Sequence, residues 1–179
     1  GISVVTEPKH FKGSMDRLLS TRQHTSLPLL MKDIVTSPTQ VDAASKLGAD
    51  AVLLIQALFD RGYCDGELDD MIGGAHDQRM EVLLETHTRR EFEKALNSDA
   101  DLIGINNRDL ATLSVDLHVT QRMLASLDCE GRIVVSESGI RTVDDIRFLK
   151  SCGARAFLIG SSLLSASDVE GRVRVFVEA

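Results

Sequence analysis

The stretch that decides the fold is Ala51-Val52-Leu53-Leu54-Ile55, a run of five apolar residues that begins shortly after Gly48. The run is too short for a helix, so it predicts a β-strand. A strand that is apolar at every position must be covered on both faces, and this is typical of a parallel sheet with helices on each side. The stretch therefore predicts the centre of an α/β protein.

Similar strands and intervening helices are predicted along the whole chain. The other predicted strands are 2–6, 29–31, 81–85, 102–105, 133–136 and 156–159. The predicted helices are 14–23, 37–48, 66–72, 88–96, 117–126 and 142–153, followed by an amphipathic terminal helix with Val169, Val173 and Phe176. Helix starts are indicated by Ser37-Pro38 and by the Thr142/Asp145 pair, and helix ends are indicated by Gly48 and Gly153. Residues 56–64 are predicted to be a connection, and Gly73-Gly74 is predicted to end or break its helix.

The alternation gives seven β-then-α units, with no break in composition, which predicts one α/β domain over residues 1–179. A (β/α)8 barrel is favoured over a doubly wound sheet, because polar residues follow nearly every strand, as at the carboxyl end of a barrel. A barrel needs eight strands and about 250 residues. Since the chain begins inside a strand and without a methionine, we expect the first strand and helix of the barrel to be missing.

Composition excludes several classes of function. A net charge of −7 argues against a nucleic-acid partner, which requires a basic face. No apolar run approaches the length of a membrane span. The three cysteines are widely separated and predict free thiols in a reducing cytoplasm. The histidines and cysteines lack the spacing of a metal site, so we expect side-chain chemistry without a metal or another cofactor.

A lysine ends the strand that precedes the opening stretch. The order Leu29-Leu30-Met31-Lys32-Asp33 places a cation and then an anion at the carboxyl end of a buried run. A half-desolvated lysine loses its proton more easily than one in water, which suits acid–base work. The alternative is a solvated charge at the strand end, paired with Asp33.

Two glycines follow the last two predicted strands, and both lie beside serines. Gly139 follows Ser138, and Gly160 precedes Ser161. Such glycines allow backbone N–H groups to approach an anion, and the last two loops of a barrel are its usual phosphate site. The pair therefore predicts phosphate binding, and the alternative is that both glycines only make tight turns.

Three polar residues end the middle strands. Glu85 could face the mouth of the barrel as a general base, and the alternative is a solvated loop carboxylate. Asn106 and Arg108 suit a substrate that bears hydroxyls and a carboxylate. The alternative for Arg108 is a local turn in which it pairs with Asp109.

Segments spread along essentially the whole chain, in order, resemble the indole-3-glycerol phosphate synthase family. They are 3–14 (SVVTEPKHFKGS), 31–34 (MKDI), 53–55 (LLI), 84–85 (LE), 104–110 (GINNRDL), 135–140 (VSESGI) and 157–163 (FLIGSSL). The resemblance implies a cofactor-independent carboxy-lyase of tryptophan biosynthesis. Such an enzyme converts 1-(2-carboxyphenylamino)-1-deoxyribulose 5-phosphate to indole-3-glycerol phosphate, carbon dioxide and water.

The resemblance also implies residue roles. Lys32 would protonate the ribulose carbonyl oxygen, Glu85 would act as acid and base in the dehydration, and Asn106 would orient the substrate. The remaining roles are a carboxylate contact from Arg108, pocket lining by Glu137 and Ser138, phosphate binding by Gly139, Gly160 and Ser161, and apolar walls from Phe11 and Leu53.

Two departures from the family pattern stand out. Position 34 is isoleucine where the family commonly has phenylalanine. The opening segment matches the second strand of the family, so the first strand, with its glutamate, second lysine and serine, has no counterpart. Glu7 and Lys9 resemble that missing pair only superficially.

Three readings follow from the sequence. The first is the synthase. The second is a non-catalytic barrel remnant that binds phosphate ligands, self-associates or takes a partner chain at an open seam. The third is another phosphate-binding barrel enzyme, such as a phosphoribosyl isomerase, although Lys32, Glu85 and Asn106 favour the synthase over it.

Overall fold

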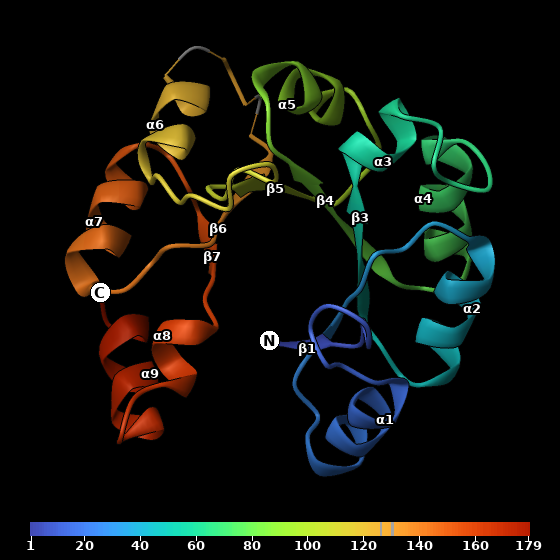
Figure 1. The fold of residues 1–179 in the computed structure, drawn as a ribbon, viewed down its shortest axis with the longest axis horizontal. Helices are drawn as coiled ribbons and strands as arrows, with labels where there is room; N and C mark the ends of the chain where they lie inside the picture. The colour runs from blue at the N-terminus through green and yellow to red at the C-terminus, as the bar shows by residue number, and fades with distance from the viewer. Residues whose placement is uncertain (126, 130) are drawn as a thin grey trace. The chain divides into compact units, whose positions relative to one another are not determined.

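A computed structural model describes residues 1–125, 127–129 and 131–179 (Figure 1). Its strands are β1 (Ile2–Val5), β2 (Leu29–Lys32), β3 (Ala51–Ile55), β4 (Glu81–Thr86), β5 (Leu102–Asn106), β6 (Ile133–Glu137) and β7 (Ala156–Leu158). Its helices are α1 (Met15–His24), α2 (Pro38–Lys46), α3 (Gln56–Asp60), α4 (Leu68–Asp77), α5 (Arg89–Leu96), α6 (His118–Leu124), α7 (Val143–Ser151), α8 (Ser161–Leu164) and α9 (Val169–Val177). The order of the strands in the sheet is their order along the chain, as the alternating pattern predicts.

The chain forms two compact units. Unit 1 contains residues 1–85 and 97–102, and unit 2 contains residues 86–96 and 103–179. No helix among the described residues is long and apolar enough to cross a membrane.

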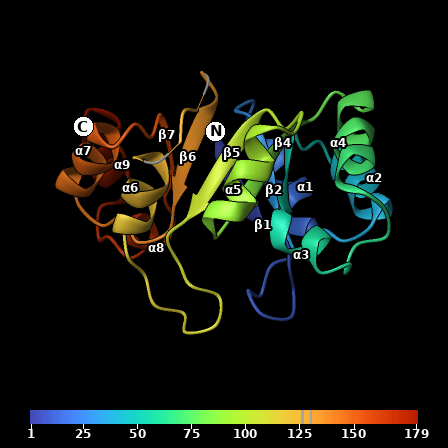
Figure 2. The same ribbon diagram turned by 90° about the horizontal axis from the view of Figure 1, so that it is seen from above.

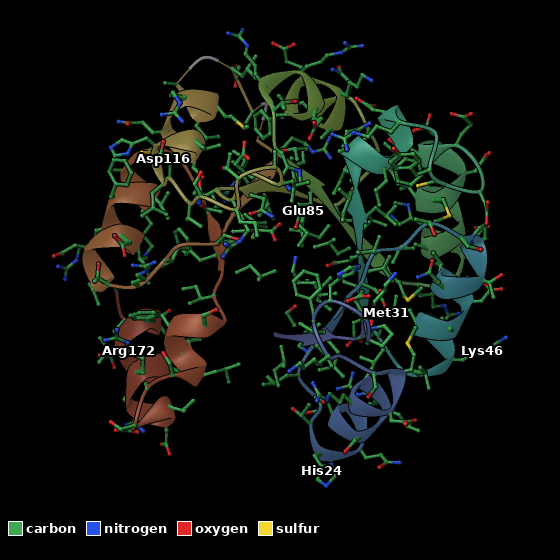
Figure 3. All side chains as sticks on the ribbon, in the orientation of Figure 1. His24, Met31, Lys46, Glu85, Asp116 and Arg172 are labelled. Carbon is green, nitrogen blue, oxygen red and sulfur yellow. The ribbon has the colours of Figure 1, made fainter. Side chains whose placement is uncertain are left out.

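Unit 1 is built on parallel pairs of strands. In the register, Val4 pairs with Met31, Leu30 with Ala51, and Ile55 with Glu85. The run 51–55 lies inside this sheet, and its three central residues are buried, as expected for a strand covered on both faces. Helices α2 and α4 contact each other along the sheet (Figures 1 and 2). Met31 is fully buried, whereas Lys46 at the end of α2 points outward (Figure 3).

The amino-terminal ends of two strands in unit 1 are held by aspartates. Asp50 accepts the backbone N–H of Leu29 (2.7 Å) and a guanidinium N–H of Arg22 (2.8 Å). Asp101 accepts the backbone N–H of Val82 (2.8 Å). Both aspartates thus satisfy a backbone donor at the start of a neighbouring strand, which favours the observed register.

Unit 2 has a core between its helices and strands. Ile140, Ile146, Leu149, Ala154 and Phe176 form one buried cluster. Helix α9 contacts α7 (Figure 1), and the Arg172 guanidinium (Figure 3) lies 4.8 Å from the centre of the Phe176 ring. Strands β6 and β7 pair in parallel, with Val135 beside Ala156.

Several local predictions were wrong. Residues 56–64 contain helix α3, and α4 continues through Gly73-Gly74 to Asp77. Burial of Ala75 on the same face as Met71 and Ile72 outweighs the low helix propensity of the two glycines. In the terminal helix only Phe176 is buried, while Val169 and Val173 are exposed. The predicted end of the helix 117–126 falls on Ser126, which lies outside the described residues.

Candidate active site

An ion pair lies at the carboxyl ends of β2 and β4 in unit 1. The Lys32 ammonium is 3.0 Å from Oε2 of Glu85. The Glu85 side chain is 5% exposed and the Lys32 side chain 29% exposed. A buried carboxylate is tolerated when it is paired, so the solvated-loop alternative for Glu85 is wrong. Glu85 is labelled in Figure 3.

The neighbour of this lysine has a different role. Asp33 accepts a short hydrogen bond from the Thr6 hydroxyl (2.5 Å) and the backbone N–H of Ile34 (2.7 Å). Asp33 therefore ties the end of β2 to the residue that follows β1. Because Lys32 pairs with Glu85 and precedes this anchored aspartate, it is not an isolated surface charge.

The loop after β1 is organised by Glu7. Its buried carboxylate accepts the backbone N–H groups of Lys9 (2.9 Å), His10 (2.6 Å) and Phe11 (2.9 Å). Burial raises the pKa of the Glu7 carboxyl, but the three backbone bonds and nearby His10 outweigh burial and lower that pKa below its ordinary value. The loop presents Phe11 with 65% of its surface exposed.

Gly13 closes the same loop. Its N–H donates to the Glu7 carbonyl (2.7 Å), and an added Cβ would lie 2.4 Å from the carbonyl oxygen of Val5. Only glycine fits this close approach of two backbone segments. Leu53, the other predicted apolar wall in this unit, is buried within β3.

Asn106 and Arg108 lie at the end of β5 in unit 2. The side-chain oxygen of Asn106 accepts the backbone N–H of Arg108 (3.0 Å), so its amide offers N–H donors to a ligand. The Arg108 guanidinium donates to the Leu113 carbonyl (3.0 Å), and Asp109 accepts N–H groups of its own loop. This pattern replaces the predicted alternative of an Arg108–Asp109 pair.

The turn after β6 has an unusual backbone. Ser138 and Gly139 have φ values of 65° and 86°, in the left-handed region. A Cβ at Gly139 would lie 2.3 Å from Cγ1 of Val115, so the packing of Val115 requires a glycine there. Glu137, the last residue of β6, is buried.

The two glycine-bearing loops of unit 2 are joined by a hydrogen bond. The Ser162 hydroxyl donates to the Ile140 carbonyl (2.8 Å). Gly160 precedes α8 and accepts the N–H of Leu163 (3.0 Å). The structure thus brings the segment 138–140 beside the segment 160–162, and a phosphate site shared by the two segments stays a prediction.

One residue in each unit was missed by sequence reasoning. Glu7 was set aside as a superficial match, although a strand-end acid followed by a loop that returns at Gly13 was a usable signal. Asn107 was passed over beside Asn106, yet it is buried in a network of hydrogen bonds. Within the described residues, no group of three or more metal-ligating side chains is assembled.

The strand order and the polar residues at the strand ends define a protein of the (β/α)-barrel class. The structure is similar to N-acetylmannosamine-6-phosphate 2-epimerase from Clostridium perfringens, with a TM-score of 0.67, 13% identity, and coverage of 89% of this chain and 72% of that one. At this identity the likeness concerns the fold alone.

The sequence places the chain more finely. The family model for indole-3-glycerol phosphate synthase matches residues 1–176, and the chain belongs to this family. It is 40% identical over 178 residues to the indole-3-glycerol phosphate synthase of Desulforamulus reducens and 41% identical over 181 residues to that of Lachnospira eligens. Each match covers 99% of this chain and 66% of the relative, so the chain spans slightly less than two thirds of these relatives.

Proposed function

We propose that this protein catalyses the ring closure that forms indole-3-glycerol phosphate from 1-(2-carboxyphenylamino)-1-deoxyribulose 5-phosphate, with loss of carbon dioxide and water. Membership of the synthase family and the names of the relatives support the reaction. The observation that carries the proposal is the Lys32–Glu85 pair at the carboxyl ends of β2 and β4. It supplies an acid and a base in contact.

Lys32 is the general acid of the first step. The aromatic carbon that bears the carboxylate attacks the ribulose carbonyl carbon, and the carbonyl oxygen takes a proton from the Lys32 ammonium. The Lys32 ammonium lies 3.0 Å from the Glu85 carboxylate, so the proton donor of this step is next to the group proposed for the later one. Loss of carbon dioxide then returns the bonding electrons to the ring.

Glu85 serves the dehydration. The new hydroxyl leaves as water after it gains a proton, and the adjacent carbon loses a proton to complete the pyrrole ring. An acid and a base are both needed for this step, and the two groups lie 3.0 Å apart. Because Glu85 is largely shielded from solvent, its charge is weakly screened where it acts.

The other predicted residues bind the substrate. Asn106 donates to a substrate oxygen, Arg108 lies near the anthranilate carboxylate, and Phe11 and Leu53 contact the aromatic part. Glu137 and Ser138 line the pocket. The phosphate is bound by Gly139, Gly160 and Ser161, whose segments are joined by the Ser162 hydrogen bond. The substrate is thus a small phosphorylated molecule.

The three free cysteines favour a cytoplasmic location, because thiols are kept reduced there.

The test is an assay for indole-3-glycerol phosphate, followed by the absorbance of the indole ring, with Glu85→Gln as the comparison. We expect turnover by the wild type and a loss of about 10²-fold or more in the variant. Glu81→Gln, on the exposed first position of β4, is the matched control and should keep wild-type turnover. If the wild type binds substrate without any turnover, the proposed enzymatic activity is refuted and a non-catalytic binding protein is favoured.

A further inference from the structure

A buried network in unit 2 joins the end of β5 to the turn after β6. Asn107 is 1% exposed. Its amide nitrogen donates to the Ser136 hydroxyl (3.0 Å) and to the carbonyls of Glu137 (2.9 Å) and Ser138 (3.2 Å). Its side-chain oxygen accepts the backbone N–H and the hydroxyl of Thr120 (3.2 and 2.8 Å).

The chemistry of these partners orients the amide in one way. The two carbonyls only accept, so the atom facing them must be the amide nitrogen, and the backbone N–H of Thr120 only donates, so the atom facing it must be the oxygen. The Thr120 hydroxyl therefore donates to Asn107, and the Ser136 hydroxyl donates to Thr120 (2.9 Å). The result is a closed ring of hydrogen bonds in which each member polarises the next.

The same residue also binds the turn through its backbone. The N–H of Asn107 donates to the Glu137 carbonyl (2.9 Å), and its carbonyl accepts the N–H of Asp116 (3.0 Å). Ser138 and Gly139 follow at positive φ. For serine this conformation costs energy and persists only where surrounding contacts hold it. The amide of Asn107 supplies such a contact at the Ser138 carbonyl.

We infer that Asn107 is a positioning residue for the phosphate group: it holds the Glu137–Ser138–Gly139 turn in the conformation that aims its backbone N–H groups at the anion. The inference rests on the proposed function, in which Gly139 binds the substrate phosphate. The side chain of Asn107 binds the backbone of the turn and the hydroxyls of Ser136 and Thr120, so it governs phosphate affinity and leaves proton transfer unchanged.

The experiment measures affinity for inorganic phosphate, as a competitive inhibitor of turnover and by direct titration. The variants are Asn107→Ala, Asn107→Asp and Thr120→Val. Thr120→Val is the matched control, because it removes one hydroxyl of the buried ring and leaves both amide–carbonyl contacts of the turn in place. Loss of a hydrogen-bonding partner that orients a metal ligand typically costs about 10- to 100-fold in affinity, and we expect a similar range for a residue that orients this turn.

We expect Asn107→Ala to weaken phosphate binding and raise KM about tenfold or more per folded molecule, with kcat within about threefold of wild type and an unchanged pH profile. Amide exchange at 138–140 should accelerate in this variant more than in Thr120→Val. Asn107→Asp places a carboxylate oxygen against two carbonyls, so its affinity should fall further. If that variant does not fold, Asn107→Ala and Thr120→Val decide the question.

Three outcomes would overturn the inference. One is wild-type phosphate affinity in folded Asn107→Ala, and another is an equal loss of affinity in Thr120→Val, which would indicate a general structural role. Neither of these two outcomes contradicts the proposed function, because that function is tested by the turnover of the wild type, which the same assay measures. The third is turnover by the wild type without competition from phosphate, which would remove the phosphate assignment on which the inference rests.

Discussion

The two ends of the strands in unit 1 use carboxylates in different ways. At the amino-terminal end, exposed Asp50 binds the backbone of Leu29 and the half-buried guanidinium of Arg22. At the carboxyl end, Glu85 is buried against the ammonium of Lys32. One carboxylate satisfies a backbone donor and favours the register, whereas the other is buried in an ion pair. Under the proposed function, stability and chemistry are therefore placed at opposite ends of the same strands.

The largest effect should come from Lys32→Met, which removes the proton donor at the reactive end. Turnover should fall about 10³-fold or more, because the variant lacks the ammonium that donates the proton in the proposed first step. The measurement is single-turnover formation of the indole product, with Lys46→Met, an exposed lysine at the end of α2, as the control. Equal activity of the two variants would show that the carboxyl-end pair is not catalytic.

Asp50→Ala tests the opposite end. It leaves the N–H of buried Leu29 without its carboxylate partner, so the free energy of unfolding should fall by about 1–3 kcal/mol, while kcat and KM of the folded protein stay near wild type. Urea unfolding and the turnover assay check the two parts. A drop in kcat without loss of stability would contradict the division between the strand ends.

Glu7 sharpens the comparison, because it lies at the carboxyl end yet binds backbone as Asp50 does. The pKa of Glu7 is lowered in the fold, so its carboxylate stabilises the protein above the ordinary value of 4.5, and this stabilisation is lost as the pH falls through the lowered value. In Glu7→Gln the melting temperature should therefore fall less on acidification from pH 5 to pH 3 than in the wild type. Parallel curves for the two proteins would exclude this role.

The smallest effect is expected at exposed Asp116 (Figure 3), which lies two residues before the start of α6. Hydrogen bonds from the backbone and ring of His118 and from Arg122 lower the pKa of Asp116 from 3.8 to about 2. Its stabilisation is complete above pH 3.8 and is lost between there and pH 2. NMR titration of the carboxyl should show the low pKa. Asp116→Asn should remove that part of the acid dependence and leave turnover at neutral pH unchanged.

Most elements could be predicted from the sequence because they depend on local signals. Ser14 caps α1, the Thr142/Asp145 capping box starts α7, and each apolar run forms the strand expected of it. The failures lie where tertiary packing outweighs propensity. Helix α4 passes through Gly73-Gly74 because its buried face continues to Ala75, and α3 follows β3 directly at Gln56.

The candidate site was predicted in its residue types more fully than in its contacts. The sequence by itself determined which residues end the strands, since the apolar runs and the polar residues after them are adjacent in the chain. It left open whether Lys32 pairs with Asp33 or with a distant acid, and it did not single out Asn107. These contacts were decided by the tertiary structure, because parallel pairing across β3 brings together Lys32 and Glu85, 53 positions apart, and a buried amide must find its partners wherever the fold places them.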